Sequence, residues 1–224
     1  MLLEYKNFFS EIECDSIIKF CSREMKPIAS SNPFNNKAEF FFTPENNLTG
    51  MVFNVNDVKI KWAIKRLCDE LNLDIEKLEH PRFQKYEIGG SYRNHYDFIL
   101  IDQKYSNYHL SRGGQRLKSL IIYLNDDFEG GETVFPKKDL IIKPEIGKVV
   151  EWTNVIEKSD TQSKESYDWS TLHGSTPIIS GNKFTLIIFE RERKFIGTPK
   201  EWLNRFPSKP SKNENKVSGF HYEN

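Results

Sequence analysis

Short strand-like segments, separated by glycine and proline breaks, fill most of the chain after His80-Pro81. Each segment is rich in Val, Ile, Phe or Tyr, residues that favour extended backbone and pack well on a pleated surface. The segments span residues 82–88, 92–98, 116–124, 132–135, 140–142, 148–153 and 183–190. Many short strands with turn signals between them predict a β-barrel or a β-sandwich.

Two helices are predicted before this strand-rich part. Ser10 and Glu13 have the spacing of a capping box, and apolar residues at helical spacing follow, so we expect a helix over about residues 10–25. A second helix is expected to begin near Asn56 or Asp57. Its apolar stripe consists of Ile60, Ile64, Leu67, Cys68 and Leu71. The fold class is therefore α+β, mainly β, with N-terminal helices that buttress one face of the strands.

The length of 224 residues fits one domain with a sizeable core. We expect this domain to cover residues 1–206, with a helical N-terminal part over 1–80 and a barrel core over about 81–195. The last residues, 207–224, are rich in Ser, Lys, Asn and Glu and predict a polar C-terminal tail.

Two polar segments interrupt the domain. Residues 29–50, which contain a run of three phenylalanines, are expected to form a long loop with a strand. Residues 154–170 form either a lid or a solvated surface loop.

The composition argues against several classes of partner. Lys plus Arg and Asp plus Glu both number 32, so the chain lacks the bulk positive charge of a nucleic-acid-binding protein. No apolar run reaches the length of a membrane span or of a signal peptide. The three cysteines, Cys14, Cys21 and Cys68, have no zinc-site spacing and suggest free thiols. We therefore expect a cytoplasmic protein that binds neither nucleic acid nor membrane.

The triplet His95-Tyr96-Asp97 is the first candidate for chemistry. Alternate residues of a strand point to the same face, so His95 and Asp97 converge if this segment is a strand. A second histidine, His173, could complete a set of two histidines and one carboxylate, the arrangement of non-haem Fe(II) oxygenases. The alternative is a surface strand whose polar residues face water.

Lys183 opens the apolar strand Phe184–Phe189, ten residues after His173. If its side chain points into a barrel, the ammonium group needs an anionic partner, which a bound carboxylate ligand would supply. Alternatively, the lysine lies at a strand edge, with its stem on apolar surface and its charge in water.

Taken together, the motifs over about residues 82–193 resemble the prolyl 4-hydroxylase family of Fe(II)- and 2-oxoglutarate-dependent dioxygenases. Five elements occur in the order found in that family. They are Y-x-x-G-x-x-Y-x-x-H-x-D at 86–97, G-G-Q-R at 113–116, Y-L-N-D at 123–126, G-G-E-T-x-F-P at 130–136, and the His–Lys pair at 173 and 183. Each element alone is weak, whereas the ordered set is specific.

The resemblance implies a double-stranded β-helix, or jelly-roll, barrel that holds iron in its mouth. By position, His95, Asp97 and His173 would be the metal ligands, and Lys183 would pair with the distal carboxylate of 2-oxoglutarate. Tyr86 and Thr133 would lie near that same cofactor. The implied cofactors are Fe(II), 2-oxoglutarate and O2, with ascorbate as the reductant.

The implied reaction couples the decarboxylation of 2-oxoglutarate to succinate with hydroxylation of a C–H bond of peptidyl proline. Tyr92 and Arg116 would line the side of the site that receives a protein or a proline-containing peptide. The presence of Asp97 favours hydroxylation, because related halogenases lack this carboxylate. Two alternatives remain: the same chemistry on a non-prolyl substrate, and a catalytically inactive binding module. The oligomeric state is not predicted.

Some residues depart from those common in the family. They are Ser119, Trp152, Phe184 and Phe189. These differences leave the implied iron and 2-oxoglutarate sites intact and bear on peptide preference.

Overall fold

The computed structural model describes residues 1–24, 39–43, 48–53, 55–101, 106–156, 161 and 163–197. The helices in this part of the chain are α1 (Glu11–Glu24), α2 (Lys61–Leu71) and the short α3 (Ser106–Ser111). The strands are β1 (Leu2–Tyr5), β2 (Glu39–Thr43), β3 (Leu48–Val52), β4 (Arg82–Tyr86), β5 (Tyr92–His95), β6 (Arg116–Tyr123), β7 (Glu129–Gly130), β8 (Thr133–Phe135), β9 (Leu140–Ile142), β10 (Val149–Thr153), β11 (His173–Ser175), β12 (Ile178–Ser180) and β13 (Lys183–Arg191).

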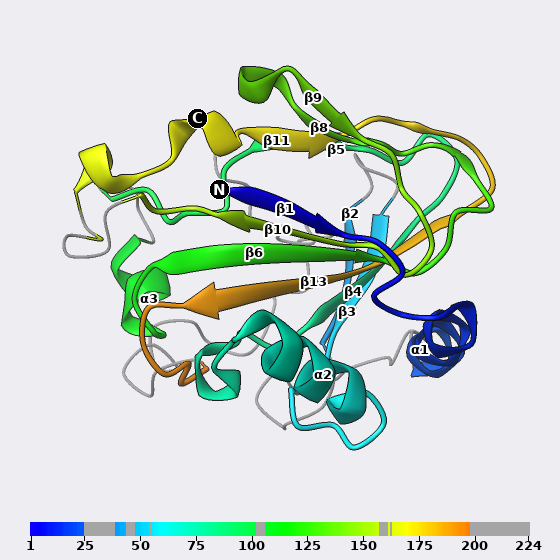
Figure 1. Cartoon of the computed structure of the whole chain (residues 1–224), viewed down its shortest axis with the longest axis horizontal. Helices are drawn as coiled ribbons and strands as arrows, with labels where there is room; N and C mark the ends of the chain where they lie inside the picture. The colour runs from blue at the N-terminus through cyan, green and yellow to red at the C-terminus, as the bar shows by residue number, and fades with distance from the viewer. Residues whose placement is uncertain are drawn as a thin grey trace, which may run out of the picture.

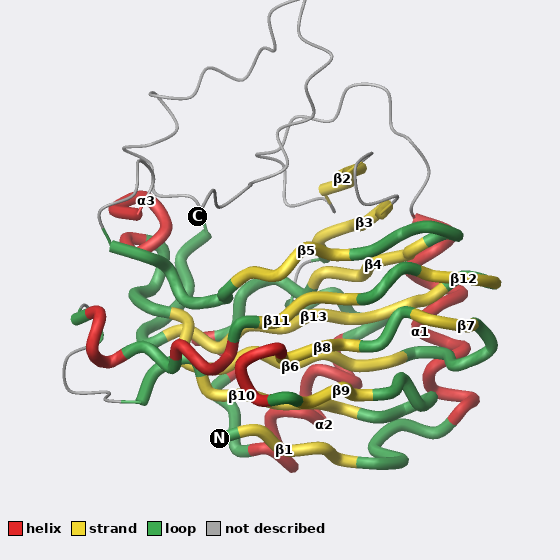
Figure 2. The backbone as a smooth tube through the Cα atoms, turned by 90° about the horizontal axis from the view of Figure 1, so that it is seen from above, coloured by secondary structure: helices red, strands yellow, loops and turns green. Residues whose placement is uncertain are grey.

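The strands form two main antiparallel sheets (Figure 1). The large sheet has the order β1-β10-β6-β13-β4-β3-β2, and the small sheet has the order β5-β11-β8-β9. Figure 2 shows the small sheet lying over the large one, with β12 and β7 paired at one end. The prediction of a mainly β, jelly-roll fold with N-terminal helices is confirmed.

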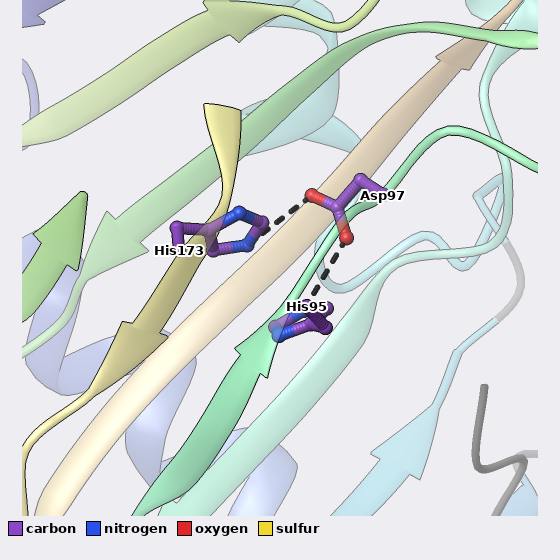
Figure 3. A group of neighbouring side chains, drawn as sticks. All are labelled: His95, Asp97 and His173. Carbon is purple, nitrogen blue, oxygen red and sulfur yellow. Dashed lines mark ion pairs between the residues drawn. The ribbon is translucent and has the colours of Figure 1, made fainter. Parts of the chain in front are cut away.

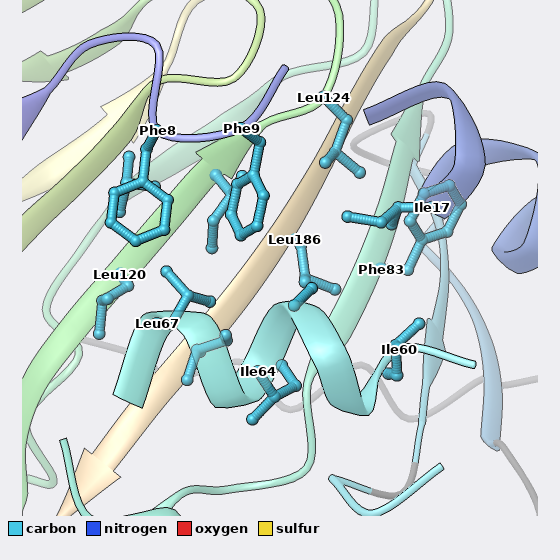
Figure 4. Close-up of a cluster of buried hydrophobic side chains, with 14 of the residues drawn as sticks. Phe8, Phe9, Ile17, Ile60, Ile64, Leu67, Phe83, Leu120, Leu124 and Leu186 are labelled. Atoms are coloured by element: carbon cyan, nitrogen blue, oxygen red, sulfur yellow. The ribbon is translucent and has the colours of Figure 1, made fainter. Parts of the chain in front are cut away.

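Helices α1 and α2 cover the outer face of the large sheet. Leu120 of β6 and Leu186 of β13 are fully buried against Ile64 and Leu67 of α2 (Figure 4). Because strand residues alternate, Ile121 and Tyr123 of β6 point the other way, into the space between the sheets. One face of each central strand thus supports the helices, and the opposite face supplies the interior of the barrel.

Helix α1 agrees with the predicted range, and its capping box is present. The backbone N–H of Ser10 donates to the Glu13 carboxylate at 2.7 Å, while the Glu13 N–H donates to the Ser10 hydroxyl at 3.4 Å. Helix α2 begins later than predicted. The Asp57 carbonyl accepts from Ile60 and Lys61, so the residues after Asp57 form a turn before the helix.

Other differences concern short elements. Strand β1 was not predicted, because only its pairing with β10 identifies so short a segment as a strand. The predicted strand 92–98 ends at His95. The segment 29–50 contributes two paired strands, β2 and β3, instead of one; its residues 29–38 and 44–47 lie outside the described residues, as does the tail 207–224.

The remaining polar segment, 154–170, contains two short 3-10 turns among its described residues. Its role as a lid stays a prediction. No helix in the described parts of the chain is long and apolar enough to cross a membrane.

Candidate active site

Three predicted metal ligands meet between the sheets. His95 ends β5 and His173 begins β11, and these two residues are direct partners in the strand register. The Nε2 atoms of both histidines lie 3.5 Å from the Asp97 carboxylate, His95 from Oδ1 and His173 from Oδ2 (Figure 3). One ligand atom from each residue lies within 4.8 Å of the other two. Side chains far apart in the sequence therefore form one compact donor set.

Backbone carbonyls fix the orientation of both imidazoles. The Nδ1 atom of His95 lies 2.9 Å from the Arg93 carbonyl oxygen, and that of His173 lies 2.9 Å from the Thr171 carbonyl oxygen. Because a carbonyl oxygen only accepts, each Nδ1 must carry the proton. In a neutral ring with this tautomer, Nε2 keeps its lone pair and faces Asp97, as metal-ligating histidines require.

The charges in this cluster also suit a cation. Burial, and then the neighbouring His95, lower the pKa of His173 to about 4, so this ring is neutral at pH 7. Burial alone would raise the pKa of Asp97, but His173, His95 and the Arg116 guanidinium together lower it below its ordinary value. Neutral imidazole nitrogen and ionised carboxylate are the ligand types of a non-haem Fe(II) site.

The route by which Asp97 reaches this cluster differs from the prediction. Strand β5 ends at His95, so Asp97 lies in a bend after the strand and not two places along it. The buried side chain of Gln115 holds this bend by accepting from the Ile99 N–H at 2.6 Å and donating to the Ile99 carbonyl at 2.9 Å. Gln115 thus replaces the strand pairing that the segment lacks.

The donor set opens into a cavity that all eight predicted site residues line. Its walls are formed by Arg82, Gln84, Tyr86, Tyr92, His95, Tyr96, Asp97, His109, Arg112, Arg116, Ile121, Thr133, Trp152, His173, Gly174, Ser175, Lys183, Ile187 and Phe189. The sequence therefore identified residues that share one space, although their roles stay predictions.

Lys183 lies in this cavity with its side chain 1% exposed. Its Nζ donates to the Gly131 carbonyl at 2.6 Å and to the Ser175 hydroxyl at 3.2 Å, and the rings of Tyr86 and Tyr123 flank it. No carboxylate among the described residues lies within ion-pairing distance of the Lys183 Nζ. Burial therefore lowers the pKa of Lys183 to about 7, and an anionic ligand would stabilise its charged form.

The two tyrosines beside this lysine each form a side-chain hydrogen bond. The Tyr123 hydroxyl and Thr133 Oγ1 are 2.6 Å apart, and the Tyr86 hydroxyl donates to the Gln84 side-chain oxygen at 3.1 Å. Thr133 and Tyr86 were predicted as cofactor contacts, whereas Tyr123 was not. Its position in the Y-L-N-D motif was the available signal, because alternation along β6 turns Tyr123 inward with Ile121.

Glu79 forms ion pairs with three arginines, of which Arg82 and Arg116 line the cavity. Its Oε1 lies 2.6 Å from Nε of Arg116 and 2.7 Å from Nε of Arg191, and its Oε2 lies 3.2 Å from Arg82. Glu79 is 3% exposed, and the three guanidiniums outweigh its burial and hold its pKa well below the ordinary value. Arg116 is thereby fixed in the wall, with a further contact of 3.4 Å to the Asp97 carbonyl.

Tyr92, the other residue predicted on the substrate side, lies beside the metal ligands with its ring tilted against that of His95. Its ring centroid lies 4.6 Å from that of His95. Nearby, burial and the positive charges of Arg116, Arg112 and Arg191 lower the pKa of His109 to about 3. The sequence offered no signal for Glu79 or His109, because neither belongs to a motif and both are placed by long-range packing.

The described residues fit an iron ion and 2-oxoglutarate. The donor set supplies three ligands on one side of a metal, and Lys183 supplies a buried cation in the same cavity. A dicarboxylate that reaches from the metal to Lys183 would satisfy both charges.

Comparison with known proteins identifies the class. Residues 81–191 match the model of the 2OG-Fe(II) oxygenase superfamily, and this range contains the three ligands and Lys183. The structure resembles the 2-oxoglutarate complex of a viral collagen prolyl hydroxylase from Paramecium bursaria Chlorella virus-1, with a TM-score of 0.56 and 24% identity over 85% of this chain and 94% of that one.

Two curated relatives are similar to this chain over most of its length. The chain is 26% identical to a putative prolyl 4-hydroxylase of Acanthamoeba polyphaga mimivirus, covering 84% of this chain and 73% of that protein. It is 27% identical to probable prolyl 4-hydroxylase 3 of Arabidopsis thaliana, covering 81% of this chain and 66% of that protein. The chain thus spans about two thirds to three quarters of the length of these relatives.

Residues 81–191 therefore form a domain of the 2OG-Fe(II) oxygenase superfamily, and the chain is a 2-oxoglutarate-dependent dioxygenase. The two curated relatives given above are named as a putative and a probable prolyl 4-hydroxylase. The predicted cofactors Fe(II), 2-oxoglutarate and O2 are confirmed by this membership. Ascorbate is typical of the prolyl hydroxylases, and the requirement for it in this chain stays a prediction.

Proposed function

We propose that this protein hydroxylates proline residues in a protein or peptide substrate. The observation that carries the proposal is one cavity holding the His95–Asp97–His173 donor set, the buried Lys183, and Tyr92 with Arg116. The relatives named as prolyl 4-hydroxylases support the choice of proline.

In this proposal the donor set and Lys183 bind different cofactors. His95, Asp97 and His173 hold Fe(II), and the Lys183 ammonium binds the distal carboxylate of 2-oxoglutarate. When these cofactors and O2 are bound, oxidative decarboxylation of 2-oxoglutarate to succinate and CO2 supplies the oxidant that converts a C–H bond to C–OH.

The protein contributes position and a dry environment. Ile121, Ile187 and Phe189 are apolar parts of the wall and exclude water from the reacting atoms. Arg116, fixed by Glu79, and Tyr92 orient the peptide from the opposite side. An error of about 1 Å in this placement would be costly, because hydroxylation needs the target C–H bond close to the metal.

The test is a panel of proline-containing peptides incubated with the protein, Fe(II), 2-oxoglutarate and ascorbate. Mass spectrometry follows the peptides, and succinate is measured in the same samples. We expect a gain of one oxygen on proline that is absent with His95→Ala. Succinate without peptide oxidation would overturn the choice of substrate. If a metal-loaded protein produced no succinate and no oxidised peptide, the proposed activity itself would be overturned.

A further inference from the structure

Trp152 belongs to β10 and lines the same cavity as the metal ligands and Lys183. Its side chain is 2% exposed. The indole ring lies edge-on to His173, with ring centroids 4.7 Å apart, and edge-on to Phe135 of the small sheet at 5.5 Å. Trp152 therefore lies at the metal end of the cavity, in contact with one of the ligands.

The indole Nε1–H of Trp152 has no hydrogen-bond acceptor among the described residues. The tryptophans at 62 and 169 behave differently: their indole N–H groups donate to the carbonyls of Lys59 at 3.0 Å and Lys164 at 2.9 Å. Buried indole N–H groups usually find a partner, because leaving such a donor unpaired costs free energy. The missing acceptor is therefore expected from a molecule that enters the cavity.

The position of Trp152 relative to Lys183 and His173 indicates which group this acceptor is. Lys183 provides a cation that contacts Ser175 of β11, and His173 of the donor set lies two residues earlier on the same strand. An elongated dicarboxylate anchored at Lys183 has its second carboxylate at the metal, beside His173. That carboxylate has more lone pairs than a metal uses, so it can accept a hydrogen bond as well.

We propose that the Trp152 indole N–H donates a hydrogen bond to the metal-side carboxylate of 2-oxoglutarate. The inference rests on the 2-oxoglutarate dependence of this family. Trp152 then recognises the co-substrate directly, in addition to supporting His173 by ring contact. A hydrogen bond to a charged acceptor is stronger than one between neutral groups, so its loss should be measurable in binding alone.

Direct observation uses protein labelled with nitrogen-15 in its tryptophans and loaded with Zn(II), which is diamagnetic and does not turn over. The Trp152 indole signal is assigned by its absence from Trp152→Phe. Adding 2-oxoglutarate should move this proton signal downfield and slow its exchange with solvent. The signals of Trp62 and Trp169 serve as internal references, because their N–H groups already have acceptors. An unchanged Trp152 signal in protein saturated with 2-oxoglutarate would overturn the proposal.

Binding measurements give a second, independent readout. The dissociation constant of 2-oxoglutarate for Mn(II)-loaded protein should rise about tenfold in Trp152→Phe, while affinity for Mn(II) alone stays the same. Phe135→Leu is the matched control, because it loosens the same aromatic packing and keeps the N–H group. If both variants weakened 2-oxoglutarate binding equally, the effect would come from packing, and the proposed hydrogen bond would be wrong. If the unsubstituted protein failed to bind 2-oxoglutarate at all, the family-based function itself would fail.

Discussion

The Lys183 ammonium lies 2.6 Å from the carbonyl oxygen of Gly131, a neutral partner in a fully buried position. The turn at Gly131 is tight: its φ is +70°, and an added Cβ would lie 2.5 Å from Ile178. Glycine therefore allows the carbonyl to approach the lysine. This contact holds the cation in place without neutralising it, and it leaves the charge available for a ligand.

The first prediction concerns pH. The pKa of Lys183 in the folded protein is about 7, below its ordinary value of 10.5. As pH rises above about 7, the free site loses its proton, and 2-oxoglutarate must bind together with a proton. The affinity for 2-oxoglutarate should therefore fall on going from neutral to alkaline pH. Calorimetry in two buffers with different ionisation enthalpies would measure the proton uptake.

The same shift has a consequence for stability. Between about pH 7 and pH 10.5 the unfolded chain binds more protons at Lys183 than the folded chain, so this residue makes the free protein more stable as pH rises through that range. Lys183→Arg is the control, because a guanidinium stays charged and should abolish both effects. Proton-independent binding by the unsubstituted protein would contradict the assignment of Lys183.

The second prediction concerns the metal. Asp97→Asn removes the only negative charge of the donor set and keeps the side-chain volume nearly unchanged. Affinity for Mn(II) should fall by more than about 100-fold, since losing a residue that only orients a ligand already costs up to that much. Equilibrium dialysis with metal analysis would measure it. Asp69→Asn, which removes an exposed ion pair with Lys65 on α2, should leave the affinity unaltered.

The third prediction concerns Glu79. Glu79→Gln leaves Arg116, Arg191 and Arg82 without their shared carboxylate, and the free energy of unfolding should fall by about 3–5 kcal/mol. The control is Glu76→Gln, which breaks an exposed ion pair with Lys194 and should cost about 1 kcal/mol or less. Chemical denaturation would compare the two. Equal, small losses would show that the buried cluster contributes little to stability.

The fourth prediction concerns Gln115. Gln115→Met retains similar volume but leaves both the N–H and the carbonyl of Ile99 without this partner. Because Asp97 belongs to the same bend, affinity for Mn(II) should fall by about 10- to 100-fold, as for other residues that orient ligands. The measurement is made well below the unfolding temperature of the variant. A variant that is less stable but binds metal normally would restrict Gln115 to a structural role.

The sequence predicted the strands whose signal lies within one run of residues and missed those that depend on pairing with distant strands. Strands β6 and β13 were predicted nearly to the residue, because their apolar runs are long and turn signals bound them. Strand β11 was missed, since His-Gly-Ser has no strand character of its own and becomes a strand only through pairing with β5 and β8. The same pairing brings His173 opposite His95.

In the candidate site, too, residues in motifs were predicted, whereas contacts across the fold were not. Motif order identified eight of the residues that line the cavity. The reason given for the convergence of His95 and Asp97 was wrong, because Asp97 lies beyond the end of the strand. Glu79 and Gln115, which hold Arg116 and the Asp97 bend, act through contacts across the fold. Glu79 belongs to no motif, and Gln115 lies in the G-G-Q-R motif, which does not reveal that its side chain contacts the backbone of Ile99.

The central claim is tested most directly by the fate of isotopically labelled O2. The protein is incubated with Fe(II), 2-oxoglutarate and a proline peptide under O2 enriched in the heavy isotope of oxygen. We predict one heavy oxygen atom in the succinate and one in the hydroxyl group of the product proline, formed in equal amounts and absent with His95→Ala. Unlabelled hydroxyproline, or labelled succinate without any oxidised peptide, would contradict the proposed prolyl hydroxylation.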